Sequence, residues 1–303
     1  MISLNEITLG DKGLFDRYVG ANEVKVSEMS FTNLFIWRKP YESRFAVVGG
    51  FLCVFHAGAA GEEYAMFPIA DRPMGPDEHA EALAACLGEL RGYFRGKGKV
   101  PLIRKADKDQ VGLALSAAAG SAVSHDRDSG DYVYLSSDLI GLKGKRYDGK
   151  RNHMNKFKSL YDWEYVRMTP ENAREAVAVL EGWVASRDEG DVGAGYERLA
   201  NMELLESFGS LSCKGAFIKA DGRYCAYTVG DVPKGDTAVI HVEKGDARYS
   251  GIYAMINQQF CENEWKDVAY INREQDMGNE GLRKAKLSYQ PAAMVDKYDI
   301  RLI

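Results

Sequence analysis

The sequence predicts an α/β (α+β) protein built from two similar halves, and three observations support this fold class. The chain has 303 residues, a length that suits two domains of about 150 residues each. Strand-like and helix-like hydrophobic patterns alternate along it. Hydrophobic residues make up 46% and charged residues 27%, which is typical of a folded protein rather than a disordered one. We expect one domain over residues 1–137 and a second over residues 138–303.

The first half begins with a predicted β-hairpin. Two apolar runs, Phe45–Val48 and Phe51–Phe55, flank Gly49-Gly50, and adjacent glycines supply the positive φ angles that a two-residue turn needs. Apolar residues at helical spacing predict a helix over Asp77–Arg95. The remaining predicted elements are strands over Tyr64–Ile69, Val100–Arg104 and Tyr132–Leu135 and a short helix over Asp107–Ala117.

The second half repeats this coarse order of strands and helices. Pro170 predicts the start of a helix that ends at Ala185, because the first helical position does not need an N–H group. Asp221-Gly222 predicts a type I′ turn between two strands. The predicted strands are Trp163–Met168, Ala216–Ile218, Tyr224–Val229, Ala238–Glu243, Val268–Ile271 and one at the C-terminus, and the further helices are 150–161, Tyr196–Phe208, Ile252–Phe260 and one near residue 283.

Charge and cysteine content exclude several classes of protein. The net charge of −5 argues against a surface that binds polyanions everywhere, so contact with nucleic acid or lipid headgroups needs a local basic patch. The five cysteines have no Cys-x-x-Cys spacing, which indicates reduced thiols, and neither they nor the five histidines predict a metal site. The chain starts without a signal-peptide pattern, and its apolar runs are too short to span a bilayer. We expect a cytoplasmic protein without a transmembrane segment.

Residues 143–158 form such a basic patch, with seven Lys and Arg residues against one acid, Asp148. If this segment is helical, Arg151, Asn155 and Lys158 share one flank at i, i+4 and i+7. Arg151 and Lys158 can then grip one polyanion, so we assign these three residues to substrate binding. The alternative is a solvated helix, since charge runs usually face water.

A strand, a polar turn and a helix follow one another over residues 238–260. Backbone N–H groups before the helix, together with Arg248, can hold an anion such as a phosphate. This pattern predicts a cofactor-binding turn made of Arg248, Tyr249, Ser250 and Gly251. Glu243 ends the preceding strand and is a candidate general base. The alternatives are an ordinary turn and an exposed glutamate.

Residues 270–289 contain many positively and negatively charged side chains close together in the sequence. We assign Arg273, Arg283 and Lys286 to substrate binding, the last two because they lie three residues apart on one helix face. Asp276 is a second candidate for the catalytic carboxylate. The alternative is an ion-paired structural cluster. The residues expected to face the core are Leu282, Ala285 and Tyr289.

Three segments together resemble the C-terminal cytosolic domain of lysylphosphatidylglycerol synthases, and in particular the stand-alone bacterial proteins of that family. The segments are GKRYDGKRNHMNKFKSLYDWEYV at 144–166, AVIHVEKGDARYSGIYAMINQQF at 238–260 and YINREQDMGNEGLRKAKLSYQP at 270–291. The resemblance covers residues 130–303 well and the first half loosely. It implies two GNAT-type acyltransferase folds in tandem, with the active half at the C-terminus.

The resemblance also implies a reaction. Relatives of this kind, including the Fem-type aminoacyltransferases, take an aminoacyl group from a charged tRNA and pass it to an amine or hydroxyl. Arg248 and Gly251 then stand where GNAT enzymes place their phosphate-binding turn, and Glu243 or Asp276 assists deprotonation of the acceptor. Tyr253 departs from this pattern, because acetyl-CoA enzymes prefer a small residue there. The cationic lining of the substrate channel would be Arg151, Asn155, Lys158, Arg273, Arg283 and Lys286.

We therefore expect no permanently bound cofactor, aminoacyl-tRNA as the donor, and a small-molecule, peptide or lipid-headgroup acceptor. Two alternatives stay open. One is an acetyl-CoA- or acyl-CoA-dependent N-acetyltransferase, and the other is a non-catalytic module that binds RNA or another anion on the same fold.

Overall fold

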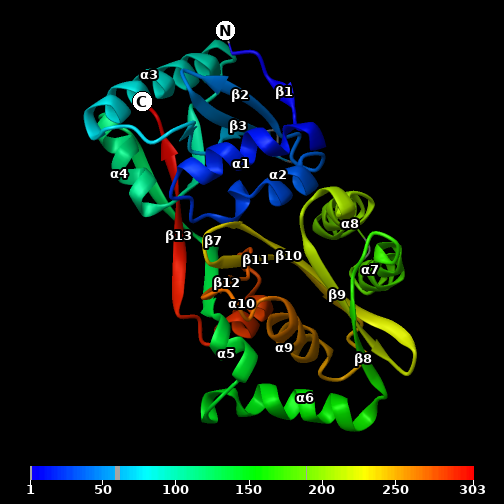
Figure 1. Ribbon diagram of the computed structural model, residues 1–303. Helices are drawn as coiled ribbons and strands as arrows, with labels where there is room; N and C mark the ends of the chain where they lie inside the picture. Colours follow the sequence, from blue (N-terminus) through cyan, green and yellow to red (C-terminus); the bar gives the residue numbers. More distant parts are fainter. Residues whose placement is uncertain (1, 59–61, 189) are drawn as a thin grey trace. The chain divides into compact units, whose positions relative to one another are not determined.

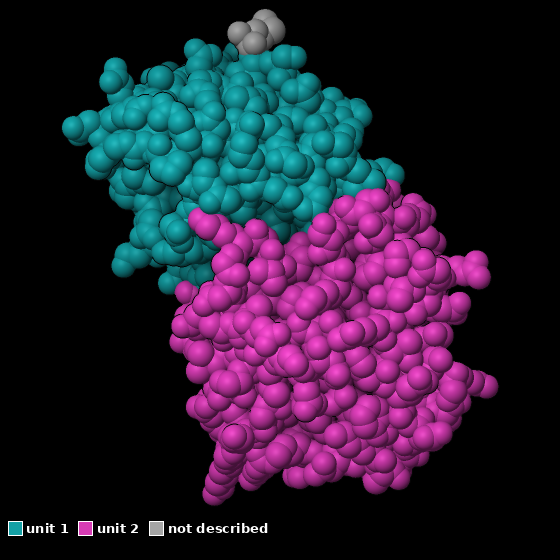
Figure 2. Space-filling view, in the orientation of Figure 1, with its two compact units in different colours: residues 1–131, 275–278, 295–303 teal, residues 132–274, 279–294 magenta. Residues whose placement is uncertain are grey.

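The chain divides into two compact units (Figure 2). The computed structural model describes residues 2–58, 62–188 and 190–303. The first unit contains residues 1–131, 275–278 and 295–303, and the second contains residues 132–274 and 279–294. The expected boundary lies at 137/138, whereas the first change of unit follows residue 131 and residues 275–278 and 295–303 belong to the first unit. The C-terminal segment belongs to the first unit because the last strand pairs there, Ile300 opposite Ile103.

The first unit contains a mostly antiparallel sheet in the order β1-β2-β3-β4-β6-β13, with β5 paired to β3 and only β4 and β6 parallel among the described pairs (Figure 1). Its strands are β1 (Asn5–Glu6), β2 (Arg44–Val48), β3 (Phe51–Ala57), β4 (Glu63–Ala65), β5 (Ile69–Ala70) and β6 (Leu102–Ala106). Its helices are α1 (Lys12–Ala21), α2 (Phe31–Trp37), α3 (Pro76–Gly96) and α4 (Lys108–Ala117), with short 3-10 turns at Leu9–Asp11 and Ser27–Met29. Strands β7 (Ala122–Leu135) and β13 (Ala293–Arg301) contribute residues to both units.

The predicted hairpin and the long predicted helix of this unit are confirmed. Gly49 and Gly50 join β2 to β3 with φ angles of 57° and 85°. Helix α3 buries Leu83, Leu87 and Leu90 against the sheet, as their spacing predicts. The strand expected over Tyr64–Ile69 is two short strands instead, because β4 and β5 pair with different parts of β3.

The second unit contains a sheet in the order β7-β12-β11-β10-β9-β8, in which β11 and β12 run parallel. Its other strands are β8 (Trp163–Arg167), β9 (Lys214–Ala220), β10 (Arg223–Lys234), β11 (Thr237–Gly245) and β12 (Tyr270–Asn272). Its helices are α5 (Ser136–Gly141), α6 (Asp148–Leu160), α7 (Ala176–Ala185), α8 (Val192–Glu206), α9 (Ile252–Glu264) and α10 (Glu280–Leu287), with 3-10 turns at Lys145–Tyr147, Ala173–Glu175 and Phe208–Ser210. The predicted α/β class is therefore confirmed.

Helix α9 and the pair α7 and α8 cover opposite faces of this sheet (Figure 1). Consecutive residues of β10 show this, because side chains alternate along a strand. Ala226 lies on the face that Ile252 of α9 covers. The hydroxyl of Tyr227 instead donates to Asn201 of α8 at 2.7 Å. A buried core between α9 and the sheet results, and α6 packs on the outer side of α9.

One predicted helix start is wrong. Pro170 does not begin a helix, and α7 starts only at Ala176, after the 3-10 turn. The side chain of Asn172 explains the delay, because it accepts a hydrogen bond from the Thr169 N–H at 2.7 Å and donates to the Arg167 carbonyl at 3.0 Å. These bonds hold the chain in a turn before the helix.

No helix among the described residues is long and apolar enough to cross a membrane.

Candidate active site in the second unit

Glu243, near the C-terminal end of β11, lies at the centre of a partly buried polar cluster. Its Oε1 accepts a hydrogen bond from Nη2 of Arg273 at 3.0 Å, and its Oε2 accepts one from Nδ2 of Asn257 at 3.4 Å. The Glu243 and Arg273 side chains are 14% and 12% exposed. The parallel pairing of β11 with β12 brings Arg273, which directly follows β12, beside Glu243, and α9 supplies Asn257. The expected residues Glu243 and Arg273 therefore lie together.

Two tyrosines surround the guanidinium of Arg273. Its Cζ lies 4.8 Å from the ring centroid of Tyr289 and 5.9 Å from that of Tyr134. Burial is the largest single effect and lowers the pKa of Arg273, but the Glu243 carboxylate, Tyr289 and Tyr134 together outweigh it, so the pKa is raised overall. Arg273 is therefore a fixed cation within an aromatic wall.

Two buried atoms of this cluster have no hydrogen-bond partner within the described part of the chain. They are Nη1 of Arg273, a donor, and Oδ1 of Asn257, an acceptor. Leaving such an atom unpaired costs about 1–3 kcal/mol, so each is normally satisfied by water or by a ligand. The Glu243 cluster thus offers one unused donor, on Arg273, and one unused acceptor, on Asn257, and both residues bond to the Glu243 carboxylate.

Lys150 adds a second cation to this cluster. It lies in the first turns of α6, and its Nζ is 3.8 Å from the ring centroid of Tyr289. Burial and the charge of Arg273 lower the pKa of Lys150 to about 8, against the opposing effect of Glu243. A lysine with this pKa exists partly as a neutral amine near neutral pH.

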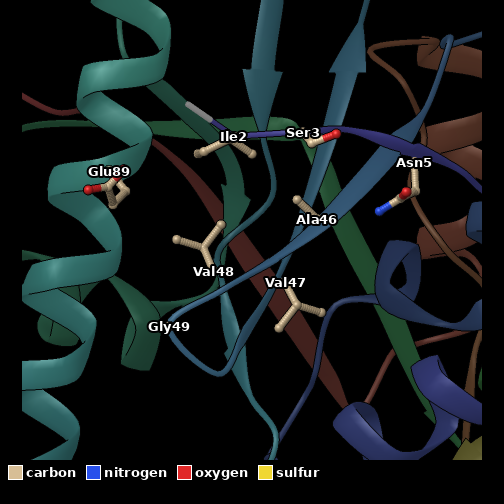
Figure 3. Close-up of a pocket in the computed structure, with 8 residues that line it drawn as sticks. All are labelled: Ile2, Ser3, Asn5, Ala46, Val47, Val48, Gly49 and Glu89. Carbon is tan, nitrogen blue, oxygen red and sulfur yellow. The ribbon is translucent and has the colours of Figure 1, made fainter.

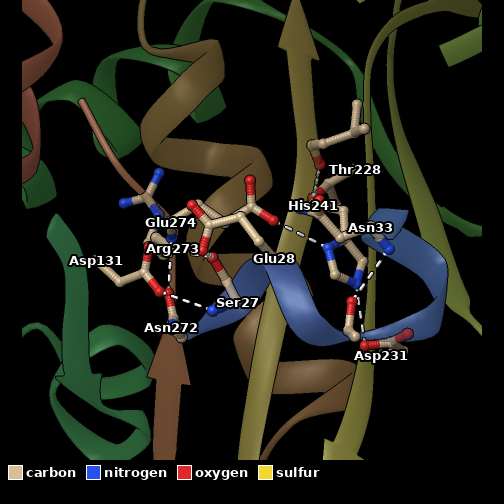
Figure 4. A network of polar contacts seen from close by, with 12 residues as sticks. Ser27, Glu28, Asn33, Asp131, Thr228, Asp231, His241, Asn272, Arg273 and Glu274 are labelled. Atoms are coloured by element: carbon tan, nitrogen blue, oxygen red, sulfur yellow. Dashed lines mark hydrogen bonds and ion pairs between the residues drawn. The ribbon is translucent and has the colours of Figure 1, made fainter. Parts of the chain in front are cut away.

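A charged histidine holds the loop that carries Arg273 (Figure 4). The buried ring of His241 contacts Glu274 through Nδ1 and Asp231 through Nε2, each at 3.0 Å. Burial lowers the pKa of His241, but the two carboxylates raise it to about 10. Lys286 donates from Nζ to the carbonyl oxygens of Arg273 and Glu274. Lys286, expected to bind substrate, therefore supports the backbone beside Arg273.

The turn before α9 is occupied by internal contacts. Arg248 is 88% exposed and forms an ion pair with Asp246 at 2.6 Å. The N–H groups of residues 248, 249 and 252 bond to Asp246 or Tyr249 within the turn. Gly251 has a φ of 93°, and a Cβ there would lie 2.3 Å from the carbonyl oxygen of His153, so packing against α6 requires glycine. Ser250 is partly buried.

Side chains of α6 divide between the interior and the surface. The predicted helix is confirmed, and Met154 and Phe157 are buried beneath it. Arg151 bonds to the carbonyl oxygens of Leu142 and Gly144 and pairs with Asp148, so it supports the start of the helix. Asn155 and Lys158 are exposed, and Nζ of Lys158 lies 5.4 Å from the Trp163 ring centroid.

Asp276 does not share a unit with Glu243, because residues 275–278 belong to the first unit. Its side chain is fully buried, accepts the Gly278 N–H at 2.9 Å and lies 3.4 Å from Nη1 of Arg127. Through these contacts Asp276 stabilises the turn at residues 275–278.

The predicted inner face of α10 is wrong for two of three residues. Leu282 is 42% exposed and Ala285 is exposed, whereas Lys286 is buried. The two carbonyl groups that Lys286 bonds draw this charged residue inward and rotate the leucine outward. Tyr289 is buried as expected. Arg283 is partly buried on the same helix.

A hollow of about 570 Å³ opens elsewhere, in the first unit (Figure 3). It is lined by Ile2, Ser3, Asn5, Ala46, Val47, Val48, Gly49 and Glu89. Among the described residues of this lining, Glu89 is the one charged residue, and no expected site residue takes part. Across the described ranges, no group of three or more His, Cys, Asp and Glu residues is arranged to hold a metal ion.

Comparison with known proteins identifies the family. Residues 22–301 match the family described as phosphatidylglycerol lysyltransferase, C-terminal. The chain belongs to this family. A conserved protein of unknown function from Bacteroides thetaiotaomicron VPI-5482 is 33% identical, with a TM-score of 0.90 and 100% of both chains covered.

More distant structures show the fold of the family. L-PGS from Bacillus licheniformis is 15% identical, with a TM-score of 0.59, and the match covers 86% of this chain and 83% of that one. A tandem GNAT protein from the clavulanic acid biosynthesis pathway is 11% identical, with a TM-score of 0.53 over 100% and 99% of the two chains. The expected GNAT-like acyltransferase fold and the expected family are thus confirmed.

One curated relative is an uncharacterized protein of Mycoplasmoides gallisepticum, which is 23% identical over 182 residues. The match spans 58% of this chain and 57% of that relative's length.

Sequence reasoning missed Lys150, Asn257 and Tyr289 as members of the cluster. Lys150 lies in the basic segment 143–158. Helical spacing groups Arg151 with other residues on one flank, but it cannot show that Lys150 faces Tyr289. Asn257, Gln258 and Gln259 form a polar run between the apolar stretches of α9, and that interruption is the signal that could have identified Asn257.

Proposed function

We propose that this family member is an aminoacyltransferase that takes an aminoacyl group from aminoacyl-tRNA and passes it to an amine or hydroxyl acceptor. The observation that carries the proposal is the Glu243 cluster, with its unused donor on Arg273 and unused acceptor on Asn257. An aminoacyl ester presents an ammonium group and a carbonyl oxygen on neighbouring carbons. A site for it needs acceptors for the first and a donor for the second.

The cluster supplies both. The Glu243 carboxylate and Oδ1 of Asn257 suit the ammonium group of the donor, while Nη1 of Arg273 suits the carbonyl oxygen. During acyl transfer that oxygen gains negative charge, and a fixed cation beside it stabilises the transition state. Because both Glu243 oxygens accept hydrogen bonds, we assign Glu243 to binding the donor rather than to proton transfer.

The choice of tRNA over acyl-CoA rests on the turn before α9. A CoA pyrophosphate needs backbone N–H groups that are open to it. Here internal bonds take three of these groups, and Arg248 pairs with Asp246. The hydroxyl of Tyr253 donates to the Gly245 carbonyl at 3.0 Å, which holds a bulky ring at the start of the helix. The exposed cations of α6, Lys158 among them, suit a nucleic-acid backbone instead.

The test is a transfer assay with the purified protein. Labelled aminoacyl-tRNAs and labelled acyl-CoAs are offered with three classes of acceptor: small amines, peptides and vesicles that contain phosphatidylglycerol. We expect transfer from an aminoacyl-tRNA, and a loss of about 10²-fold or more in Glu243→Gln and Arg273→Lys. Glu181→Gln is the matched control, because Glu181 forms a solvent-accessible ion pair with Arg198 away from the Glu243 cluster.

Two other outcomes separate the alternatives. Transfer from acyl-CoA alone favours an N-acetyltransferase. No transfer from either donor, with salt-sensitive RNA binding that Lys158→Ala at an exposed position weakens, favours a non-catalytic module.

A further inference from the structure

We propose that Lys150 is the proton acceptor of the transfer reaction, an inference that rests on the proposed function. The neutral Nζ takes a proton from the acceptor amine or hydroxyl as that nitrogen or oxygen bonds to the acyl carbon. The bond between the acyl carbon and the ribose oxygen of the donor then breaks. Lys150 returns the proton to the ribose oxygen and ends neutral, so the step needs no other reactant.

The first argument is the position of Lys150. Its Nζ lies over the ring of Tyr289, and the Arg273 guanidinium lies over the same ring. Both side chains therefore contact the Tyr289 ring, and the charge of Arg273 is near enough to lower the pKa of Lys150. The residue that would polarise the acyl carbonyl and the residue that would accept the proton are thus neighbours, as acyl transfer requires.

The second argument is that Nζ of Lys150 is not engaged in a structural hydrogen bond or ion pair with a described residue. The part of the chain that the structure describes gives its Nζ no hydrogen bond and no ion pair, only the contact with Tyr289. Lys286 provides the contrast in the same unit, because its Nζ bonds to two carbonyl oxygens. Of these two lysines, Lys150 is the one whose nitrogen lone pair can become available.

The third argument is the electrostatic setting. Arg273, from the loop after β12, repels the proton on Lys150, and Glu243, from β11, attracts it. Tyr289, after α10, stays neutral because burial raises its pKa. From α9, burial raises the pKa of the Cys261 thiol to about 12, so it also stays neutral. With Glu243 paired to Arg273, burial leaves Lys150 with a pKa of about 8, which suits a general base near neutral pH.

The fourth argument is that α6 is held firmly. The carbonyl of His153 fits against Gly251, and Phe157 is fully buried beneath the helix. A base must remain within hydrogen-bond reach of the acceptor, and these contacts fix the helix that carries Lys150.

The first experiment measures the protonation of Lys150 without any substrate. The protein is acetylated with trace acetic anhydride over a range of pH, and peptide mass spectrometry gives the reactivity of Lys150 against a lysine-containing reference peptide in the same tube. We expect half-maximal reactivity at about pH 8 for Lys150 and at about pH 10.4 for the reference. A midpoint at or above that of the reference overturns the proposal, whatever the transfer activity.

The second experiment uses the donor and acceptor found in the transfer assay. Lys150→Arg keeps the charge but cannot give up its proton near neutral pH. We expect kcat/KM to fall by about 10²–10⁴-fold in this variant. The wild-type rate should rise through an apparent pKa of about 8, and that rise should disappear in Lys150→Arg. Lys156→Arg, an exposed position on the same helix, is the matched control.

These results separate the two proposals. An active Lys150→Arg enzyme with the wild-type pH profile overturns the role of Lys150 and leaves the aminoacyltransferase proposal standing. A wild-type protein that is inactive with every aminoacyl-tRNA overturns both. If Lys150 only packs against Tyr289, Lys150→Arg keeps both the activity and the wild-type pH profile, and this result overturns the proposal.

Discussion

The ring of His241 lies between the carboxylates of Glu274 and Asp231, at 3.0 Å from each. Glu274 directly follows Arg273 in the chain and has a φ of 56°, so this ion-paired histidine fixes the backbone beside the proposed carbonyl-binding residue. The strand β11 thus contributes to the site twice, through Glu243 and through His241.

This relationship predicts how stability depends on pH. The pKa of His241 is about 10 in the folded protein and about 6.5 in the unfolded chain, so its contribution is complete below about pH 6.5 and is lost as pH rises through 10. We expect His241→Gln to lower the free energy of unfolding by about 3–5 kcal/mol at pH 6, as for other broken buried ion pairs. The difference from wild type should shrink toward pH 10. Urea unfolding at several pH values measures this, with the exposed His153→Gln as the control.

Gly251 gives a prediction that separates packing from ligand binding. Gly251→Ala places a Cβ against the His153 carbonyl at a positive φ, so we expect a loss of about 2–4 kcal/mol in the free energy of unfolding. Gly149→Ala is the control on the neighbouring helix, because nothing lies within 4 Å of a Cβ there. It should stabilise the protein by about 0.5–1 kcal/mol. A Gly251→Ala protein of unchanged stability that loses activity would instead restore the phosphate-binding interpretation of this turn.

Local chemistry explains why parts of the fold were predictable. The turn at Asp221-Gly222 was expected because two adjacent residues must adopt positive φ, and they do so at 51° and 77°. Helix α3 was expected because its apolar residues repeat at helical spacing. In both cases residues close in the chain determine the structure.

The site itself depends on residues far apart in the chain. Lys150 meets Tyr289 only because α6 packs on α9 and the segment after α10 returns to the same core. No spacing rule connects residues 139 positions apart. The same reason explains the error at Leu282, since two carbonyl groups on the segment after β12 draw Lys286 inward. It also explains why the sequence did not predict that Asp276 lies in the other unit.

Arg248 provides a test of the proposed donor. Its side chain projects into solvent and pairs with Asp246, so Arg248→Ala should leave the midpoint of urea unfolding unchanged. If tRNA rather than CoA is the donor, transfer should also continue at the wild-type rate. The measurement is the transfer assay with Arg248→Ala beside wild type. Loss of transfer, with rescue by Arg248→Lys, would show that the turn binds a phosphate after all.

The pair of Glu243 and Arg273 predicts a strongly non-additive pattern in stability. Removing one partner leaves the other as a partly buried, unpaired charge, whereas removing both leaves a neutral site. We expect Glu243→Gln and Arg273→Met each to lower the free energy of unfolding by about 3 kcal/mol, and the double variant to lose less than the sum of the two. Urea unfolding of all four proteins gives the coupling energy. Additive losses would mean that the two side chains do not interact in solution, and the proposed arrangement around the aminoacyl group would then have no support.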